Sequence, residues 1–131
     1  MQAFNSEEGL VMCGSNALHV DEVCRPIYPT TLPLDDWDIR CVALFENPFV
    51  HSAVMMRSDV FRSAGAYNLD YSTTQDYDLW IRIFKFGKVR NLRPQLVKLR
   101  RHEKSVSAAS KSMQLDRTVM VQCGYAAEFL C

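Results

Sequence analysis

The residues best suited to chemistry lie in the segment Thr-Thr-Gln-Asp-Tyr-Asp-Leu-Trp-Ile-Arg, residues 73–82. This segment opens a predicted amphipathic helix over residues 75–86, and it places the carboxylates of Asp76 and Asp78 in the first helical turn. A carboxylate held at the start of a helix, beside a loop such as residues 68–73, has a defined position and access to a substrate. Asp76 therefore has the placement of a general base, a group that takes a proton from a reacting hydroxyl.

The same segment also suits a purely structural role. Thr73 and Asp76 have the spacing of a capping box, and an acidic residue in the first turn stabilises a helix through the helix dipole. On spacing alone the cap is the favoured interpretation of Asp76, although one side chain can fill both roles. Asp78 lies four residues before Arg82, which predicts an ion pair between them on one face of the helix.

His51 lies in a second notable segment, the apolar stretch Asn-Pro-Phe-Val-His-Ser-Ala-Val-Met-Met-Arg of residues 47–57. Residues 50–56 of this stretch predict a strand, because apolar side chains dominate it. Two interpretations of His51 are equally supported. It is either a group that faces a binding site, or a partly buried histidine at a strand start that is satisfied by a hydrogen bond.

A third segment, Arg-Arg-His-Glu-Lys at residues 100–104, brings three cations and a histidine together after a predicted strand. Guanidinium groups match phosphate oxygens in geometry and charge, so Arg101 and His102 could contact a phosphate group. The alternative is a solvated basic turn, which the residues by themselves favour.

In this order, the three segments resemble the acceptor-side part of a family 2 glycosyltransferase with the GT-A fold. The resemblance covers residues 2–107 and is densest over residues 47–107. It implies that Asp76 is the general base that takes the proton of the acceptor hydroxyl. Gln75 stands where that family usually has glutamate, so it keeps the hydrogen-bonding shape but loses a charge.

The resemblance also implies roles for the other polar residues. His51 would shape the pocket near the floor of the active site. Arg101 and His102 would assist the leaving diphosphate of a nucleotide-sugar donor. Trp80 lies at core spacing on its helix and is expected to pack in the core, with a secondary role in lining the acceptor pocket.

No metal site is assigned within this chain. Two Asp-x-Asp strings occur, at residues 36–38 and 76–78, but both fall at predicted helix starts, where each successive side chain is turned by about 100°, so the two carboxylates cannot chelate one ion side by side. The resemblance implies that the complete enzyme uses a divalent metal, Mn²⁺ or Mg²⁺. Its Asp-x-Asp ligands would belong to a nucleotide-binding half expected before residue 1, and His102 could join only such a site.

Composition excludes several classes of protein. The 131 residues carry 15 basic and 15 acidic side chains, so no global charge favours nucleic acid or an anionic membrane. No apolar window approaches the roughly 20 residues of a membrane span, and the N-terminus has no signal-peptide pattern. The five cysteines contain no Cys-x-x-Cys pair, which indicates reduced thiols and a cytoplasmic protein.

The pattern of elements predicts a single mixed α/β (α+β) domain over residues 1–131, a partial GT-A-like domain with a short mixed sheet packed with helices. The expected strands cover residues 9–20, 50–56, 89–92 and 96–100, with Arg93-Pro94 dividing the last two, and residues 25–29 are extended. The expected helices begin near residues 33, 59, 75 and 113. Ser58 is the expected N-cap of the second helix, and Gly65 stands at its C-terminal end.

We therefore expect the acceptor-side part of an inverting enzyme that moves a sugar from a nucleotide-diphosphate donor to a hydroxyl of a glycan or lipid-linked acceptor. Without a nucleotide-binding half the chain is expected to be inactive alone. A sheet cut in this way exposes an edge, so we also expect a homo-oligomer. The alternative function is a non-catalytic module of the same fold that binds a glycan or a protein. The complete enzyme could be peripheral to a membrane.

Overall fold

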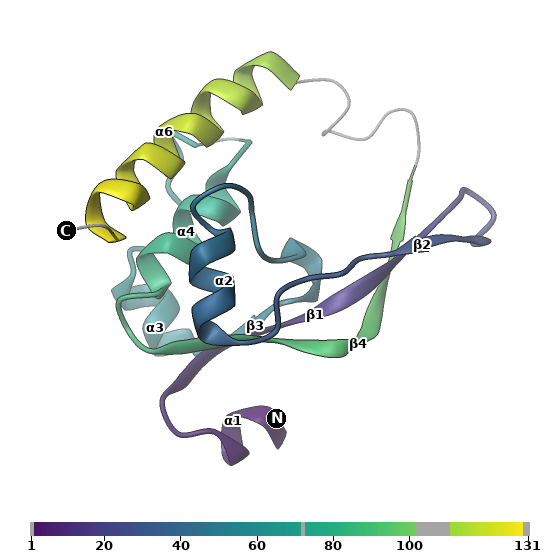
Figure 1. Cartoon of the computed structure of the whole chain (residues 1–131), viewed down its shortest axis with the longest axis horizontal. Coiled ribbons are helices and arrows are strands. Elements are labelled where there is room, and N and C mark those ends of the chain that lie inside the picture. The colour runs from purple at the N-terminus through teal and green to yellow at the C-terminus, as the bar shows by residue number, and fades with distance from the viewer. Residues whose placement is uncertain (1, 72, 102–110, 130–131) are drawn as a thin grey trace.

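The computed structural model describes residues 2–71, 73–101 and 111–129. These residues form a mixed α/β fold in which helices pack against a four-stranded sheet, as the sequence predicts. Figure 1 shows α2, α4 and α6 on one side of the sheet and α1 on the other. The helices are α1 (Gln2–Ser6), α2 (Asp36–Val42), α3 (Ser58–Ser63), α4 (Gln75–Ile83) and α6 (Lys111–Phe129).

The sheet is built around β1 (Leu10–Val20), whose apolar residues are largely buried. β4 (Lys88–Arg100) runs parallel to β1 along its whole length. The other side of β1 pairs antiparallel with β2 (Pro26–Pro29) at one end and with β3 (Met55–Met56) at the other. The paired ends of β1, β2 and β4 extend beyond the helical layer as an arm (Figure 1).

The prediction of two strands divided at Arg93-Pro94 is wrong, because β4 is continuous from Lys88 to Arg100. Along β1, Ser15 pairs with Leu92 but the next residue, Asn16, pairs with Gln95, so Arg93 and Pro94 form a bulge. The Asn16 side-chain amide donates to the Arg93 carbonyl at 3.1 Å. A bulge on an edge strand tolerates proline, which has no N–H to donate to the ladder.

The prediction of a strand over residues 50–56 is mostly wrong. Only Met55–Met56 forms a strand, and His51–Ala53 forms a 3₁₀ turn. That turn closes because the Ala53 N–H donates to the Val50 carbonyl at 2.8 Å, which takes the backbone out of the extended conformation.

The start of the second predicted helix also differs from expectation, because Ser58 lies inside α3 and Arg57 is its N-cap, with no side-chain cap. Its end is as predicted: Gly65 has φ of +84°, and its N–H donates to the Arg62 carbonyl at 3.0 Å. Glycine suits this left-handed position because it has no Cβ. α4 ends at Ile83, three residues earlier than predicted.

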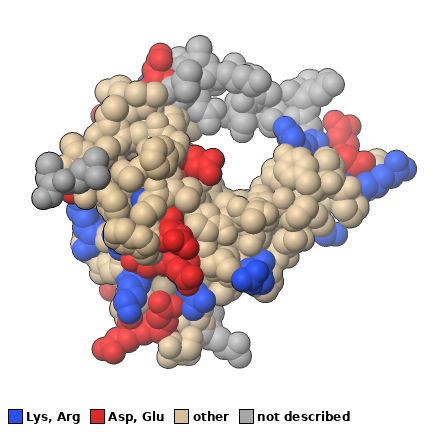
Figure 2. Space-filling view, viewed as in Figure 1, with Lys and Arg blue, Asp and Glu red and all other residues tan. Residues whose placement is uncertain are grey.

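The core lies between the sheet and the helical layer, with α4 at its centre. Trp80, Leu79 and Ile83 of this helix are fully buried, as are Met12 of β1 and Ile39 of α2. Among the described residues no helix is long and apolar enough to cross a bilayer. On the face shown in Figure 2, acidic and basic side chains are interspersed and do not gather into one patch.

Candidate functional site

Asp76 is the second residue of α4, and its partners contradict the capping-box interpretation. The N-cap is Thr74 and makes no side-chain cap bond, so the helix begins one residue later than a cap at Thr73 requires. The hydroxyls of Thr73 and Thr74 are buried and have no hydrogen-bond partner among the described residues. The Asp76 carboxylate instead accepts a 2.9 Å hydrogen bond from the side-chain amide of Asn47. Its side chain is half-buried and therefore open to solvent on one side.

His51 and Tyr67 form a polar pair close to Asp76. The His51 Nε2 atom lies 2.9 Å from the Tyr67 hydroxyl, and the two rings meet edge to face. Burial raises the pKa of Tyr67, and the negative charge of Asp76 raises it further. Tyr67 thus lies near enough to Asp76 for the carboxylate charge to raise its pKa, and its hydroxyl stays protonated at neutral pH. His51 is exposed, so the interpretation of a partly buried histidine holds only for its hydrogen bond.

Asp76, His51 and Tyr67 are called the Asp76 group below, and Trp80 and Gln75 of α4 lie next to it. Trp80 is fully buried, which confirms the prediction that it packs in the core. Its ring lies edge to face against Phe49 at a centroid distance of 5.9 Å and against His51 at 5.9 Å. Trp80 therefore forms the base on which the His51 ring rests. Gln75, the first residue of α4, is half-buried beside Asp76.

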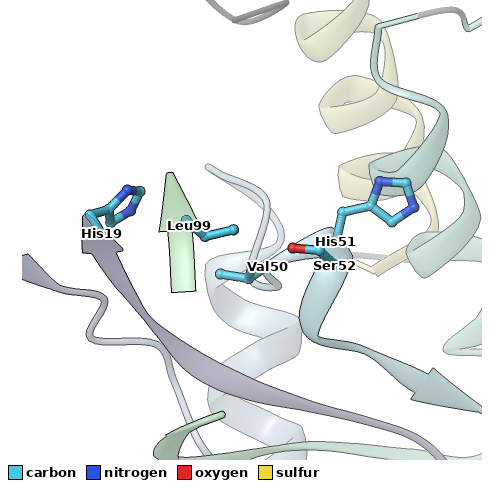
Figure 3. A pocket seen from close by; sticks show the side chains of 5 residues that line it. All are labelled: His19, Val50, His51, Ser52 and Leu99. Carbon is cyan, nitrogen blue, oxygen red and sulfur yellow. The ribbon is translucent and has the colours of Figure 1, made fainter. Parts of the chain in front are cut away.

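A pocket of about 570 Å³ adjoins the His51 backbone between the 3₁₀ turn and the ends of β1 and β4. Figure 3 shows its wall: His19 lies near the end of β1 and Leu99 lies on β4, while Val50 and Ser52 approach from the turn. The His51 ring points away from Val50 and Leu99, toward the Tyr67 side. His51 thus stands between the pocket and the Asp76 group, and the pocket could hold a ligand of sugar size.

Arg101 follows the last residue of β4 and is held by Tyr28 of β2. Its guanidinium donates to the Tyr28 hydroxyl at 2.8 Å and lies 5.9 Å from the centroid of the Tyr28 ring. Tyr28 in turn stacks on His19 at 4.4 Å. Burial lowers the pKa of His19, and the positive charge of Arg101 lowers it further. His102, the other predicted diphosphate contact, lies outside the described residues.

Two of the four carboxylates in the Asp-x-Asp strings are held in ion pairs. Asp36 accepts from Arg40 at 2.8 Å and from the Val89 N–H at 2.8 Å. Asp78 accepts from Arg82 at 2.6 Å, which confirms the predicted ion pair. Within residues 2–71, 73–101 and 111–129 no three His, Cys, Asp or Glu side chains lie close enough to hold a metal ion. The described donor set therefore does not fit a divalent cation.

Sequence reasoning missed Asn47 and Tyr67 as members of the site. Asn47 lies 29 residues before its partner Asp76, and its Asn-Pro context marks the end of a helix. Tyr67 follows the turn at Gly65 and has no distinguishing pattern. Only the fold brings these side chains to Asp76, so a single sequence holds no signal that pairs them.

Comparison with known proteins finds similarity to bacterial glycosyltransferases. The chain is 36% identical over 96 residues to the amylovoran biosynthesis glycosyltransferase AmsE of Erwinia amylovora, a match that covers 72% of this chain and 35% of that protein. An uncharacterized glycosyltransferase of Haemophilus influenzae is 34% identical over 77 residues, 58% of this chain and 24% of its own length. The uncharacterized glycosyltransferase RC0461 of Rickettsia conorii is 30% identical over 78 residues, 60% of this chain and 13% of its own length.

No family model matches the chain. The chain spans about a third of the Erwinia protein and less of the other two relatives. It is homologous, over part of its length and of theirs, to bacterial glycosyltransferases.

Proposed function

We propose that this chain is the acceptor-side part of an inverting family 2 glycosyltransferase with the GT-A fold, in which Asp76 is the general base. The observation that carries the proposal is the state of the Asp76 carboxylate. It is partly exposed at the start of α4, bonded to a neutral amide, and close to the His51–Tyr67 pair. The similarity to glycosyltransferases supplies the reaction that such a base would serve.

In this mechanism the Asp76 carboxylate takes the proton of an acceptor hydroxyl as the hydroxyl oxygen attacks the anomeric carbon of the donor sugar. A new carbon–oxygen bond forms on one face while the bond to the diphosphate breaks on the other, which inverts the anomeric configuration. The nucleoside diphosphate leaves with the bonding electron pair. Arg101 would stabilise that negative charge after release from Tyr28, with His102 beside it in sequence.

The two substrates that this proposal implies are a nucleotide-diphosphate sugar and a glycan or lipid-linked acceptor. A divalent metal would be held by residues other than those described, because these form no metal-binding cluster. His51, Gln75 and Trp80 would shape the acceptor side of the site. We further propose that the chain self-associates through the edge of β4 that pairs with no other strand among the described residues.

The test is an exchange of the matched 96-residue segment of the Erwinia relative for the matching segment of this chain. We expect the hybrid to transfer sugar, and Asp76→Asn to lower kcat by about 10²- to 10⁴-fold, the usual contribution of a general base. Asp70→Asn is the control, because Asp70 is an exposed loop carboxylate near Asp76 in sequence and should leave kcat unchanged.

An Asp76→Asn hybrid as active as its parent would refute the proposal. The alternative function, a glycan-binding or protein-binding module, predicts a different result. In that case the hybrid is inactive, while calorimetry shows that this chain binds a glycan without any nucleotide. Metal-dependent binding of UDP- or GDP-sugars by this chain alone would show that its donor site is complete, contrary to the proposal.

A further inference from the structure

Asn47 holds the Asp76 carboxylate in one orientation. Its side-chain nitrogen Nδ2 donates to the Asp76 Oδ2 atom at 2.9 Å, and its Oδ1 atom accepts the Phe49 N–H at 3.2 Å. The two contacts fix the amide without ambiguity. A backbone N–H can only donate, so the oxygen must face Phe49 and the NH₂ group must face the carboxylate. Within the described residues Asn47 is the only hydrogen-bond partner of the Asp76 side chain.

The backbone around Asn47 is tied to the centre of the sheet. Asn91 of β4 is 1% exposed, and its side-chain NH₂ group donates to the Pro48 carbonyl at 3.0 Å and to the Pro33 carbonyl at 2.8 Å. Asn91 thereby anchors the chain both before and after α2. A Cβ at Gly14 would lie 2.1 Å from the Asn91 Oδ1 atom, so only glycine leaves room for this anchor.

A second contact holds the same segment against α4. The Tyr77 hydroxyl donates to the Ala43 carbonyl at 2.5 Å, and the Phe49 ring packs edge to face on Trp80. Asn47 therefore stands on backbone fixed both to the sheet and to the helix that carries Asp76. A rigid donor of this kind keeps a reacting carboxylate within the narrow geometry that catalysis requires.

We propose that Asn47 is the positioning residue of Asp76. It binds Oδ2 and leaves Oδ1, which has no partner among the described residues, as the atom that receives the proton of the acceptor hydroxyl. Because the Asn47 amide is neutral, it orients the carboxylate and leaves its charge unpaired. This inference rests on the proposed function of Asp76, but the contact itself can be tested without sugar transfer.

The experiment follows the side-chain NH₂ resonances of Asn47 by ¹⁵N–¹H NMR on the full chain, from about pH 7 to about pH 3, where carboxylates titrate. We expect the chemical shifts of the Asn47 side-chain NH₂ group to change in one step at acid pH, here called the acid step. The reason is that protonation of Asp76 weakens a hydrogen bond that the ionised carboxylate accepts. The step should be lost in Asp76→Asn, where position 76 no longer titrates.

Asn47→Asp isolates the donor, because its oxygen can still accept the Phe49 N–H while the NH₂ group is lost. We expect the acid step of the Asp76 ¹³Cγ resonance to move to higher pH, since two adjacent carboxylates resist ionising together. Asn68→Asp is the matched control: Asn68 accepts the Asp70 N–H at 3.0 Å in the same kind of turn but does not bond to Asp76.

Three results would overturn the inference. They are the absence of an acid step at Asn47, a step that survives Asp76→Asn, and an Asp76 resonance that moves no further in Asn47→Asp than in Asn68→Asp. None of these readings depends on turnover. A hybrid enzyme that fails to transfer sugar would argue against the proposed function. It would not bear on whether Asn47 orients the Asp76 carboxylate, which the NMR measurements decide.

Discussion

Asp76 and Asp78 lie two residues apart on α4, yet their partners give them different roles. Asp78 accepts two hydrogen bonds from the Arg82 guanidinium, so its charge is paired and serves the fold. Asp76 accepts one bond from a neutral amide, so its charge remains available to a substrate. The sequence offers both carboxylates in the same turn of one helix. Their partners, and not their position, decide which one can act as a base.

His19 should respond to pH because of its burial and its neighbour Arg101. Burial, and then the charge of Arg101, lower its pKa below the unfolded value of about 6.5. The folded state therefore binds this proton less readily than the unfolded chain does. The stability that the neutral ring contributes is fully present above the unfolded pKa and is lost as the pH falls to the folded pKa.

We expect ¹H–¹³C NMR to show the His19 ring titrating below the pH of an unfolded histidine. Arg101→Gln should raise the His19 pKa because it removes the second cause of the shift. Arg100→Gln is the control, since Arg100 contacts the Cys24 sulfur on the same arm and is not a cause of the His19 shift. An equal shift in the two variants would contradict the Arg101–Tyr28–His19 arrangement.

Among the elements, α4 and the end of α3 are joined by Arg82. Its guanidinium bonds to Asp78 and to the carbonyls of Ala64 and Ala66, the last at 2.8 Å. Both carbonyls flank the Gly65 turn, just before Tyr67. One planar side chain with several donors thus holds the backbone that leads to the site, a geometry that lysine cannot reproduce.

We expect Arg82→Ala to lower the free energy of unfolding by about 2 to 3 kcal/mol, because it removes the hydrogen-bond donor of two carbonyls and of a carboxylate. Arg82→Lys should recover only a minor part of that loss. Arg62→Ala serves as the control, since Arg62 is exposed and makes one 3.4 Å contact within α3, and it should change stability by less than about 0.5 kcal/mol. Urea unfolding of the variants provides the measurement, and equal losses for Arg62→Ala and Arg82→Ala would refute this role of Arg82.

The elements also show how far a sequence can predict this fold. Strand β1, the start of α4 at Gln75 and the Gly65 turn follow from local patterns, since apolar runs, periodicity and glycine act over a few residues. The continuity of β4 through Pro94 does not, because it depends on a bulge opposite Asn16 on another strand. The Asn47–Asp76 hydrogen bond cannot be predicted for the same reason, because its partners meet only after α2 and α4 have packed.

The two edges of β4 differ in how they are paired. β4 pairs with β1 on one side, and its other edge pairs with no strand in the described part of the chain. The outer half of β4 is largely exposed, and Leu96 presents 63% of its surface to solvent. A long edge strand with an exposed apolar side chain is a template for pairing with another chain. A second copy of this chain meets that description most simply, since two equal edges can pair about a two-fold axis.

We expect size-exclusion chromatography with light scattering to give the mass of a dimer at high protein concentration. Leu96→Lys should shift the population to monomer, because a charge on the edge strand opposes pairing. Leu69→Lys is the matched control: Leu69 is 90% exposed but lies in the loop before α4 and not on β4, so the dimer should persist. A wild-type chain that stays monomeric at high concentration would show that the edge is not self-complementary. Equal dissociation in the two variants would place the contact elsewhere, because only one of them alters β4.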